Sequence, residues 1–376
     1  MTQTLEILDR LIAFDTVSAR SNLDMIGWIE DFLTTRGFAV TRVPDPDQPK
    51  AGLYASIGPA GAGLMLSAHT DVVPVEGQCW TRNPFRLTDE GDRLYGRGTT
   101  DMKGFLAAML SCADKAAARP LREPLKLAIS YDEEVGCIGI ARMIDALEAA
   151  IGLPRACIVG EPTEMQVAVG HKGKQALRAI CHGEAGHSAL APRFVNALHP
   201  AADLLTGLRD LQDDLSRNGA QDADYAVPCT TVHAGKLTGG TALNIVPDRA
   251  ELLFEFRHLA ADRPEELRRR IDGLIRQTAK RHGTEIELEQ VFAYPGLDTA
   301  PDAEVTRLAQ RLAQSQHLTK VAFGTEAGFF DGIGIPSVVC GPGSMEGQGH
   351  KPDEYITRAQ LAACDTMLDR VLDDLC

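Results

Sequence analysis

The chain has 376 residues, of which 44% are hydrophobic and 24% are charged, and this is typical of a globular protein too long for one ordinary core. Two domains are therefore expected. The net charge of -14 argues against nucleic acid or an anionic membrane surface as a partner. No apolar run approaches the roughly 20 residues that span a membrane, and the N-terminus lacks the pattern of a signal peptide. Nine cysteines without a CxxC pair favour reduced thiols in a cytoplasmic protein.

The first part of the chain alternates helix-like and strand-like segments, as is typical of an α/β fold. Apolar residues at helical spacing predict helices over 5–12, 22–36 and 105–113. Short apolar runs bounded by turn residues predict strands over 39–43, 53–57, 63–68, 127–129 and 156–160.

From about residue 173 the pattern changes to the order β-α-β-β-α-β of the ferredoxin-like arrangement. The predicted elements are strand 174–182, helix 196–215, strands 229–237 and 244–258, helix 264–282 and strand 285–293. The first pattern then returns, with a helix over 303–314, a strand over 338–340 and a helix over 357–375. We therefore expect residues 173–292 to be a domain inserted into another one, which 1–172 and 293–376 form together.

Three consecutive acids, Asp132, Glu133 and Glu134, follow the predicted strand 127–129. Adjacent carboxylates at a strand end repel one another, so we expect a cation to hold them. Because neighbours in an extended segment point to opposite sides, one of Glu133 and Glu134 can bind a metal while the other stays free as a general base. Taken alone, such a run is more often a solvated turn.

Four further metal-binding side chains stand where an apolar run stops, namely those of His69, Asp101, Glu161 and His350. Open α/β sheets gather their ligands at such strand ends. Position alone also fits ordinary structural roles, such as a helix N-cap for Asp101 and a turn residue for Glu161. Asp71, two residues after His69 and on the same face of the segment, can orient the imidazole.

Together with Glu134, these four residues offer two imidazoles and three carboxylates, a donor set suited to Zn²⁺ or Co²⁺. Five ligands are too many for one tetrahedral zinc ion but fit two ions if one carboxylate bridges them. Glu133 would then accept a proton from a water molecule at this site.

Several motifs resemble the M20 metallopeptidase family, and they follow one another in order along nearly the whole chain. They are His69-Thr70-Asp71, GTTDMKG at 98–104, Asp132-Glu133-Glu134, Gly160-Glu161-Pro162, Gly186-His187 and HKPDE at 350–354. The resemblance implies an α/β, zinc-exopeptidase-like catalytic domain, with a mixed sheet flanked by helices, and makes the inserted domain a lid and dimerisation domain. The implied cofactors are two divalent metal ions, with Zn²⁺ expected and Co²⁺ as the alternative.

The resemblance also assigns the ligands of each metal. It implies that His69, Asp101 and Glu161 hold one ion and that Asp101, Glu134 and His350 hold the other, so that Asp101 bridges the two.

Five more residues receive roles from the resemblance. Glu133 would be the general base and Asp71 the support of His69. His187 matches a histidine that relatives send across a dimer interface towards the oxyanion. Asn244 and Arg257 match substrate-binding positions, and Arg257 would bind the substrate's α-carboxylate through a bidentate contact.

Within the family, the phrases AFDTVS (13–18), SYDEEVGC (130–137), FGTEA (323–327) and CGPGS (340–344) look most like acetylornithine deacetylases. This implies hydrolysis of the small molecule N²-acetyl-L-ornithine to L-ornithine and acetate in arginine biosynthesis, with Glu326 as the candidate partner of the δ-ammonium. A broader N-acyl-amino-acid deacylase, a desuccinylase-like enzyme and a dipeptidase remain open. A non-catalytic metal-binding protein on a hydrolase scaffold is a more distant alternative, because it would not need Glu133 as a free base.

Overall fold

The computed structural model describes residues 2–376, which form two compact units. The first unit consists of residues 2–171, 297–321 and 325–376, and the second of residues 172–296 and 322–324. Within residues 2–376, no helix combines the length and the apolar character that crossing a membrane requires.

A nine-stranded mixed sheet forms the centre of the first unit. Four neighbouring strands, β6, β3, β7 and β15, run parallel, so their carboxyl ends meet at one edge. Antiparallel strands extend the sheet on both sides, and β14 (Leu318–Val321) pairs in parallel with β8. The order is β1 (Ala39–Pro44), β2 (Ala51–Ile57), β6 (Leu125–Ser130), β3 (Leu64–His69), β7 (Ala156–Val159), β15 (Ser337–Val339), β8 (Val167–His171) and β13 (Leu297–Asp298).

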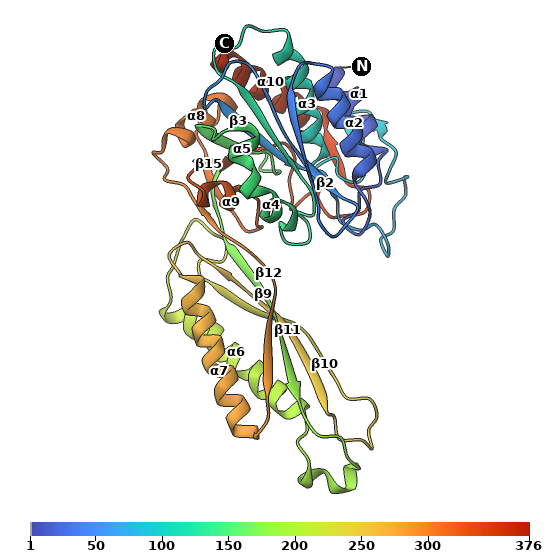
Figure 1. Ribbon diagram of the computed structural model, residues 1–376, viewed down its shortest axis with the longest axis vertical. Coiled ribbons are helices and arrows are strands. Elements are labelled where there is room, and N and C mark those ends of the chain that lie inside the picture. Colours follow the sequence, from blue (N-terminus) through green and yellow to red (C-terminus); the bar gives the residue numbers. More distant parts are fainter. Residues whose placement is uncertain (1) are drawn as a thin grey trace. The chain divides into compact units, whose positions relative to one another are not determined.

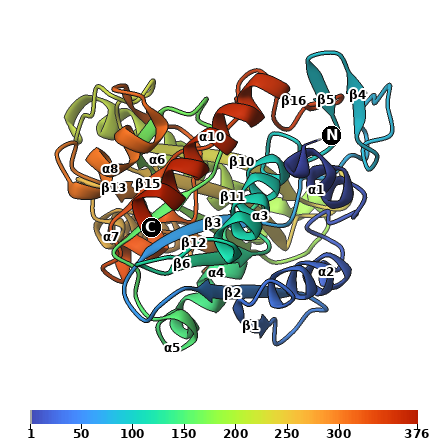
Figure 2. The same ribbon diagram turned by 90° about the horizontal axis from the view of Figure 1, so that it is seen from above.

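Helices cover both faces of this sheet, as Figures 1 and 2 show. One face carries the main apolar core, to which α1 (Gln3–Ile12), α2 (Leu23–Thr34), α3 (Lys103–Ala117), α8 (Glu304–Ala313) and α10 (Arg358–Leu375) contribute. The other face is covered by α4 (Ile138–Met143), α5 (Leu147–Ile151) and α9 (Ala327–Gly332), with the 3-10 turn Ile144–Ala146 between α4 and α5. The predicted α/β fold with a mixed sheet between helices is confirmed.

A small three-stranded sheet lies beside this core and joins two distant segments. Its order is β16 (Tyr355–Thr357), β5 (Arg93–Tyr95) and β4 (Thr88–Glu90). The pairing of Tyr355 with Tyr95 places the segment before α3 next to the segment before α10.

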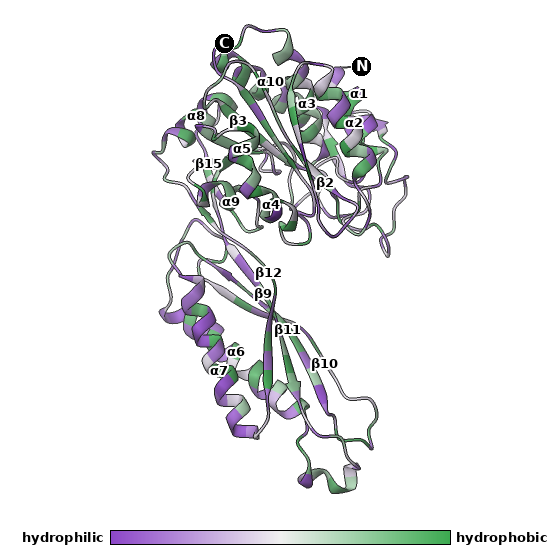
Figure 3. Cartoon of the chain, in the orientation of Figure 1, coloured by the Kyte–Doolittle hydropathy of each residue, from purple (hydrophilic) through white to green (hydrophobic). Residues whose placement is uncertain are grey.

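The second unit is a four-stranded antiparallel sheet covered by two helices. Its core lies between the sheet and α6 and α7, and Figure 3 shows that α7 is mostly hydrophilic. The buried apolar residues of α7 include Leu267, Ile271 and Ile275, which recur at helical spacing and face the sheet. The strand order is β10 (Thr231–Gly239), β11 (Arg249–His258), β9 (Gly173–His182) and β12 (Ile286–Tyr294), with α6 (Leu198–Asn218), α7 (Pro264–His282) and a 3-10 turn at Ser188–Arg193.

Some local expectations need correction. The strand predicted over 244–258 begins only at Arg249, because residues 240–248 form a loop in which Pro247 lacks the N–H that a strand pairing needs. Asp101 does not cap α3, since the helix begins at Lys103 and the N-cap is Met102. The sequence patterns also gave no indication of β8, β13 and β14.

Candidate metal centre

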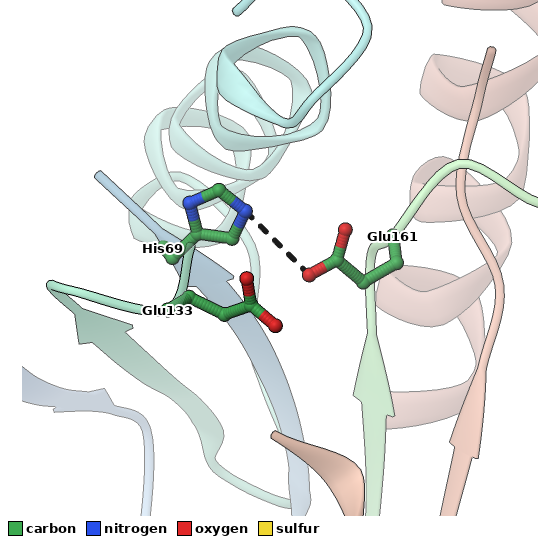
Figure 4. A group of neighbouring side chains, drawn as sticks. All are labelled: His69, Glu133 and Glu161. Atoms are coloured by element: carbon green, nitrogen blue, oxygen red, sulfur yellow. Dashed lines mark ion pairs between the residues drawn. The ribbon is translucent and has the colours of Figure 1, made fainter. Parts of the chain in front are cut away.

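Three of the predicted metal-binding segments leave the carboxyl ends of neighbouring parallel strands. His69 is the last residue of β3, Glu133 and Glu134 lie in the turn after β6, and Glu161 follows β7. Figure 4 shows the imidazole of His69 and the carboxylates of Glu133 and Glu161 pointing towards one another from these strand ends. The parallel pairing of β3 with β6 and β7 therefore creates the cluster.

Asp101 lies between two imidazoles and presents one carboxylate oxygen to each. Its Oδ1 is 3.1 Å from Nε2 of His69, and its Oδ2 is 3.0 Å from Nε2 of His350. Nε2 of His69 is also 3.5 Å from Oε1 of Glu161, and Nε2 of His350 is 3.1 Å from Oε2 of Glu134. The five side chains thus form two groups that share Asp101.

The spacing and chemistry of these side chains fit two divalent cations. Atoms bound to one ion at about 2.0–2.2 Å and at tetrahedral angles lie about 3.3–3.6 Å apart, close to the separations described above. Within residues 2–376, Oε1 of Glu134 and Oε1 of Glu161 are buried and have no hydrogen-bond partner. Buried carboxylate oxygens that accept no hydrogen bond are costly, and a bound cation would satisfy them.

Ligand atoms of His69, Asp101 and Glu134 lie within 4.8 Å of one another, and so do those of His69, Glu133 and Glu161. The carboxylate of Glu133 therefore reaches the same cluster as the predicted ligands. At this position Glu133 can serve either as a further ligand or as a general base.

The electrostatics of the cluster reflect crowded, buried carboxylates. Burial raises the pKa of Glu134 to about 7, and the nearby charge of Asp101 adds to this. Burial also raises the pKa of Glu133 and that of Glu161 well above their ordinary values. Although burial opposes it, hydrogen bonds to Asp101 and Glu134 raise the pKa of His350 to about 10. An arrangement that gathers so much negative charge binds cations or protons.

Asp71 contacts both the first imidazole and the acidic turn. Its backbone carbonyl oxygen is 2.9 Å from Nδ1 of His69, whereas its Oδ1 is 3.4 Å from the same nitrogen. The carbonyl rather than the carboxylate is therefore the nearer partner of the ring, and it favours the tautomer that leaves Nε2 free for a metal. The carboxylate of Asp71 instead accepts hydrogen bonds from the backbone N–H groups of Glu133 and Glu134.

The cation beside the acidic turn is Lys50, for which the sequence patterns gave no indication. Its Nζ lies 2.6 Å from both carboxylate oxygens of Asp132, and both side chains are buried. The backbone of Asp132 has a φ of 53°. Gly136 has a φ of 112°, which lets the chain turn, and the N–H of Gly136 donates to the carbonyl of Glu133. Nothing in the local sequence around Lys50 indicates this long-range pairing.

Glu326 stands at the start of α9 and is only 1% exposed. The hydroxyl of Ser67 is 3.5 Å from its Oε2, and the alternation along β3 puts Ser67 on the same face as His69. Its other oxygen, Oε1, has no hydrogen-bond partner within residues 2–376. Burial raises the pKa of Glu326 to about 7. Glu326 is thus a buried carboxyl group, with one oxygen that accepts no hydrogen bond from the described residues, next to the strand that carries His69.

His187, Asn244 and Arg257 belong to the second unit. The loop after β9 and the loop before β11 meet, because the N–H of Ser188 donates to the carbonyl of Asn244 and His187 pairs with Ile245. Arg257 lies on β11, and its Nε donates to Glu255 at 2.9 Å. The structure thus brings His187 and Asn244 together, whereas Arg257 forms a separate ion pair.

Comparisons with known proteins agree with this fold. Residues 65–374 match the profile of peptidase family M20/M25/M40. Acetylornithine deacetylase from Shigella sonnei (strain Ss046) is 32% identical over 380 residues, which cover 99% of this chain and 97% of that protein.

Two solved structures illustrate the similarity of fold. The M20 family metallo-carboxypeptidase Sso-CP2 from Sulfolobus solfataricus has a TM-score of 0.83 at 20% identity, with 99% of each chain covered. The YXEP protein from Bacillus subtilis, described as a dinuclear metal binding peptidase from the M20 family, has a TM-score of 0.66 at 16% identity, with 99% of this chain and 97% of that chain covered.

Proposed function

The chain belongs to peptidase family M20/M25/M40, and on this basis we propose that it is a deacetylase that hydrolyses N²-acetyl-L-ornithine to L-ornithine and acetate. The observation that carries the proposal is Asp101 between the two imidazoles, with the carboxylate of Glu133 beside them. The 32% identity to an acetylornithine deacetylase over nearly the full length supports this substrate. The product ornithine would serve arginine biosynthesis.

The proposed cofactors are two Zn²⁺ ions, with Co²⁺ as an alternative that the same nitrogen and oxygen donors accept. His69, Asp101 and Glu161 would hold one ion, and Asp101, Glu134 and His350 the other. When bound, the ions supply Lewis acidity to the amide carbonyl and lower the pKa of a water molecule.

Glu133 is the proposed general base. It would accept a proton from the attacking water and then donate it to the nitrogen of the leaving amine. Burial raises the pKa of Glu133, so the carboxylate holds a proton more readily than an exposed glutamate does. Asp71 would keep Glu133 in place through the backbone of the acidic turn.

Three residues of the second unit have proposed roles in binding. His187 would donate a hydrogen bond to the oxyanion, Asn244 would bind the substrate, and Arg257 would bind its α-carboxylate. We propose that the second unit serves as a lid and dimerisation domain, so that the enzyme acts as a homodimer. Light scattering of the purified protein tests this, and a monomeric mass with full activity would refute it.

Glu326 is the proposed partner of the substrate's δ-ammonium. Its support is a buried carboxyl group with one oxygen that lacks a hydrogen-bond partner within residues 2–376. Such a group favours a cation over a neutral side chain. The variant Glu326→Gln should lose the preference for N-acetylornithine over N-acetylnorvaline, whose side chain ends in a methyl group. An unchanged preference would exclude this role.

A kinetic panel tests the proposed reaction against its alternatives. Release of acetate and amino acid is measured with N-acetyl, N-formyl and N-succinyl amino acids and with dipeptides, with and without a chelator. We expect N²-acetylornithine to have the highest kcat/KM and the chelator to abolish turnover. A higher kcat/KM for succinyl substrates, for dipeptides or for many acetyl amino acids would identify a desuccinylase-like enzyme, a dipeptidase or a broad deacylase. No turnover of any substrate would favour a non-catalytic metal-binding protein.

A further inference from the structure

Arg97 is the largest of the fully buried side chains in residues 2–376, and it is 1% exposed. It follows β5 and precedes the turn that carries Asp101. Its guanidinium group lies 5.0 Å from the centre of the Trp80 ring, and its two terminal nitrogens reach different segments of the chain. A buried guanidinium with two separate acceptors can fix the positions of both of them.

The first acceptor leads to Asp101. Nη1 of Arg97 donates to Oε2 of Glu354 at 2.6 Å, and the side chain of Glu354 is also 1% exposed. The other oxygen of Glu354, Oε1, accepts the backbone N–H of Thr100 at 2.9 Å and that of Asp101 at 3.1 Å. Arg97 therefore holds the backbone of Asp101 through one carboxylate.

The second acceptor leads to His350. Nη2 of Arg97 donates to Oε1 of Gln78 at 2.5 Å, and Nε1 of Trp80 donates to the same oxygen at 3.0 Å. These two donors fix the orientation of the Gln78 amide, whose Nε2 donates to the backbone carbonyl of His350 at 3.2 Å. Nη1 of Arg97 also approaches the carbonyl of Lys351 at 3.4 Å.

His350 needs such support more than the other predicted ligands do. It lies in the loop before β16, its backbone has a φ of 58°, and its side chain is 44% exposed. His69, in contrast, ends a central strand and is 1% exposed. A ligand on a loop keeps its geometry only when neighbouring groups hold the loop.

We propose that Arg97 is a positioning residue for metal binding: through Glu354 it fixes Asp101, and through Gln78 it fixes His350. This inference rests on the metal-binding part of the proposed function. A role in folding alone explains these contacts less well, because both acceptors of Arg97 lead on to candidate metal ligands, Glu354 to the backbone of Asp101 and Gln78 to that of His350. Substitutions of Gln78 and of Arg97 should have different effects, because Gln78 supports only His350, whereas Arg97 supports both Asp101 and His350.

The test uses the full-length protein after removal of metal, titrated with Zn²⁺ in a calorimeter with a competing chelator. The variants are Gln78→Ala and Arg97→Lys. The matched control is Arg36→Lys, which alters an arginine of the same unit that pairs with Asp114. The melting temperature Tm of each metal-free protein is measured in parallel.

We expect the wild type and the control to bind two Zn²⁺ ions alike. Gln78→Ala should weaken one of the two binding events by about 10–100-fold. The Tm of its metal-free form should fall, because Nη2 of Arg97 loses its nearest acceptor, but the variant should stay folded at the temperature of the titration. Arg97→Lys should weaken both events, because a single ammonium group cannot replace the two separate nitrogens.

The inference is overturned if the wild type binds two ions and Gln78→Ala binds them with affinities within about twofold of the wild type. The result for Gln78→Ala decides the matter even if Arg97→Lys does not fold. A wild-type protein that binds no Zn²⁺ overturns both the inference and the metal-binding part of the proposed function. Weakened binding in the variants together with no hydrolysis of acetylornithine by the wild type would support the inference and refute only the proposed substrate.

Discussion

Asp71 accepts a hydrogen bond from the backbone N–H of Glu133, with 3.0 Å between its Oδ1 and the nitrogen. Its Oδ2 accepts the N–H of Glu134 and, at 2.7 Å, the hydroxyl of Ser18. Its backbone carbonyl is the nearest partner of Nδ1 of His69. One residue thus connects the end of β3 to the acidic turn after β6, and it sets the position of the proposed base relative to the first imidazole.

Replacing Asp71 by asparagine should lower kcat by about 10–100-fold. The amide would turn one acceptor into a donor that faces the N–H groups of the acidic turn, while the backbone carbonyl would still hold His69. We therefore expect the metal content to stay at the wild-type level. Ser18→Ala, which removes only one hydrogen bond to Asp71, should have a smaller effect. Steady-state kinetics and metal analysis check both variants, and wild-type kcat in Asp71→Asn would refute the positioning role.

Glu133 and Glu134 should respond differently to the same substitution. Glu133→Gln removes the proposed base, and we expect kcat to fall by about 10²–10⁴-fold while both metal ions remain bound. Glu134→Gln removes a proposed ligand, and we expect the variant to lose affinity for one of the two ions. Metal analysis and kcat of the two purified variants distinguish the roles. Equal metal loss in both variants would show that Glu133 is a ligand rather than a free base.

Metal binding should release protons and weaken as the pH falls. In the metal-free protein the pKa of His350 is raised to about 10, mainly by its hydrogen bonds to carboxylates against the effect of burial, and that of Glu134 is raised by burial to about 7. At pH 7 His350 is therefore protonated and Glu134 is partly protonated, and both must lose a proton to bind a metal.

Calorimetry in buffers of different ionisation enthalpy measures this proton release. We expect at least about one proton per chain to be released at pH 7, and the apparent affinity to fall steadily between about pH 8 and pH 6. The affinity for metal must fall as the pH falls, because protons compete with the metal for the same atoms of His350 and Glu134. An affinity that stays constant over this range would mean that these two groups are not ligands.

The buried pair of Lys50 and Asp132 yields a prediction about stability. Lys50→Met leaves the buried carboxylate of Asp132 without its cation, which should lower the free energy of unfolding by about 3–5 kcal/mol. The double variant Lys50→Met/Asp132→Asn should recover part of this loss, because it removes the unpaired charge. Urea unfolding of the wild type, the two single variants and the double variant measures the coupling. Additive effects would show that the two side chains do not stabilise each other.

Sequence patterns were sufficient to predict the general α/β fold, and they placed the candidate ligands at one edge of the sheet, where the structure brings their side chains together. Each of the strands β3, β6 and β7 is a short apolar run that ends next to a potential ligand, and parallel pairing brings such ends together. This rule is general for open α/β sheets and needs no knowledge of side-chain contacts. It therefore placed His69, Glu134 and Glu161 near one another.

The supporting contacts could not be predicted in this way. Lys50 is separated from Asp132 by 82 positions and Gln78 from His350 by 272 positions, and no local periodicity encodes such pairs. The strand predicted through Asn244 failed for a different reason, because apolar residues on both sides of Pro247 resembled one continuous strand. Burial of polar side chains depends on the complete fold, and only the structure reveals it.

The most direct test measures bound metal and hydrolysis of N²-acetylornithine on the same samples. The protein is purified, stripped of metal with a chelator, and then reloaded stepwise with Zn²⁺ while acetate release is followed. We predict two ions per chain in the active protein, no turnover in the stripped protein, and recovery of turnover as the ions are restored. Full acetate release by protein that contains no metal would contradict the proposed two-metal centre.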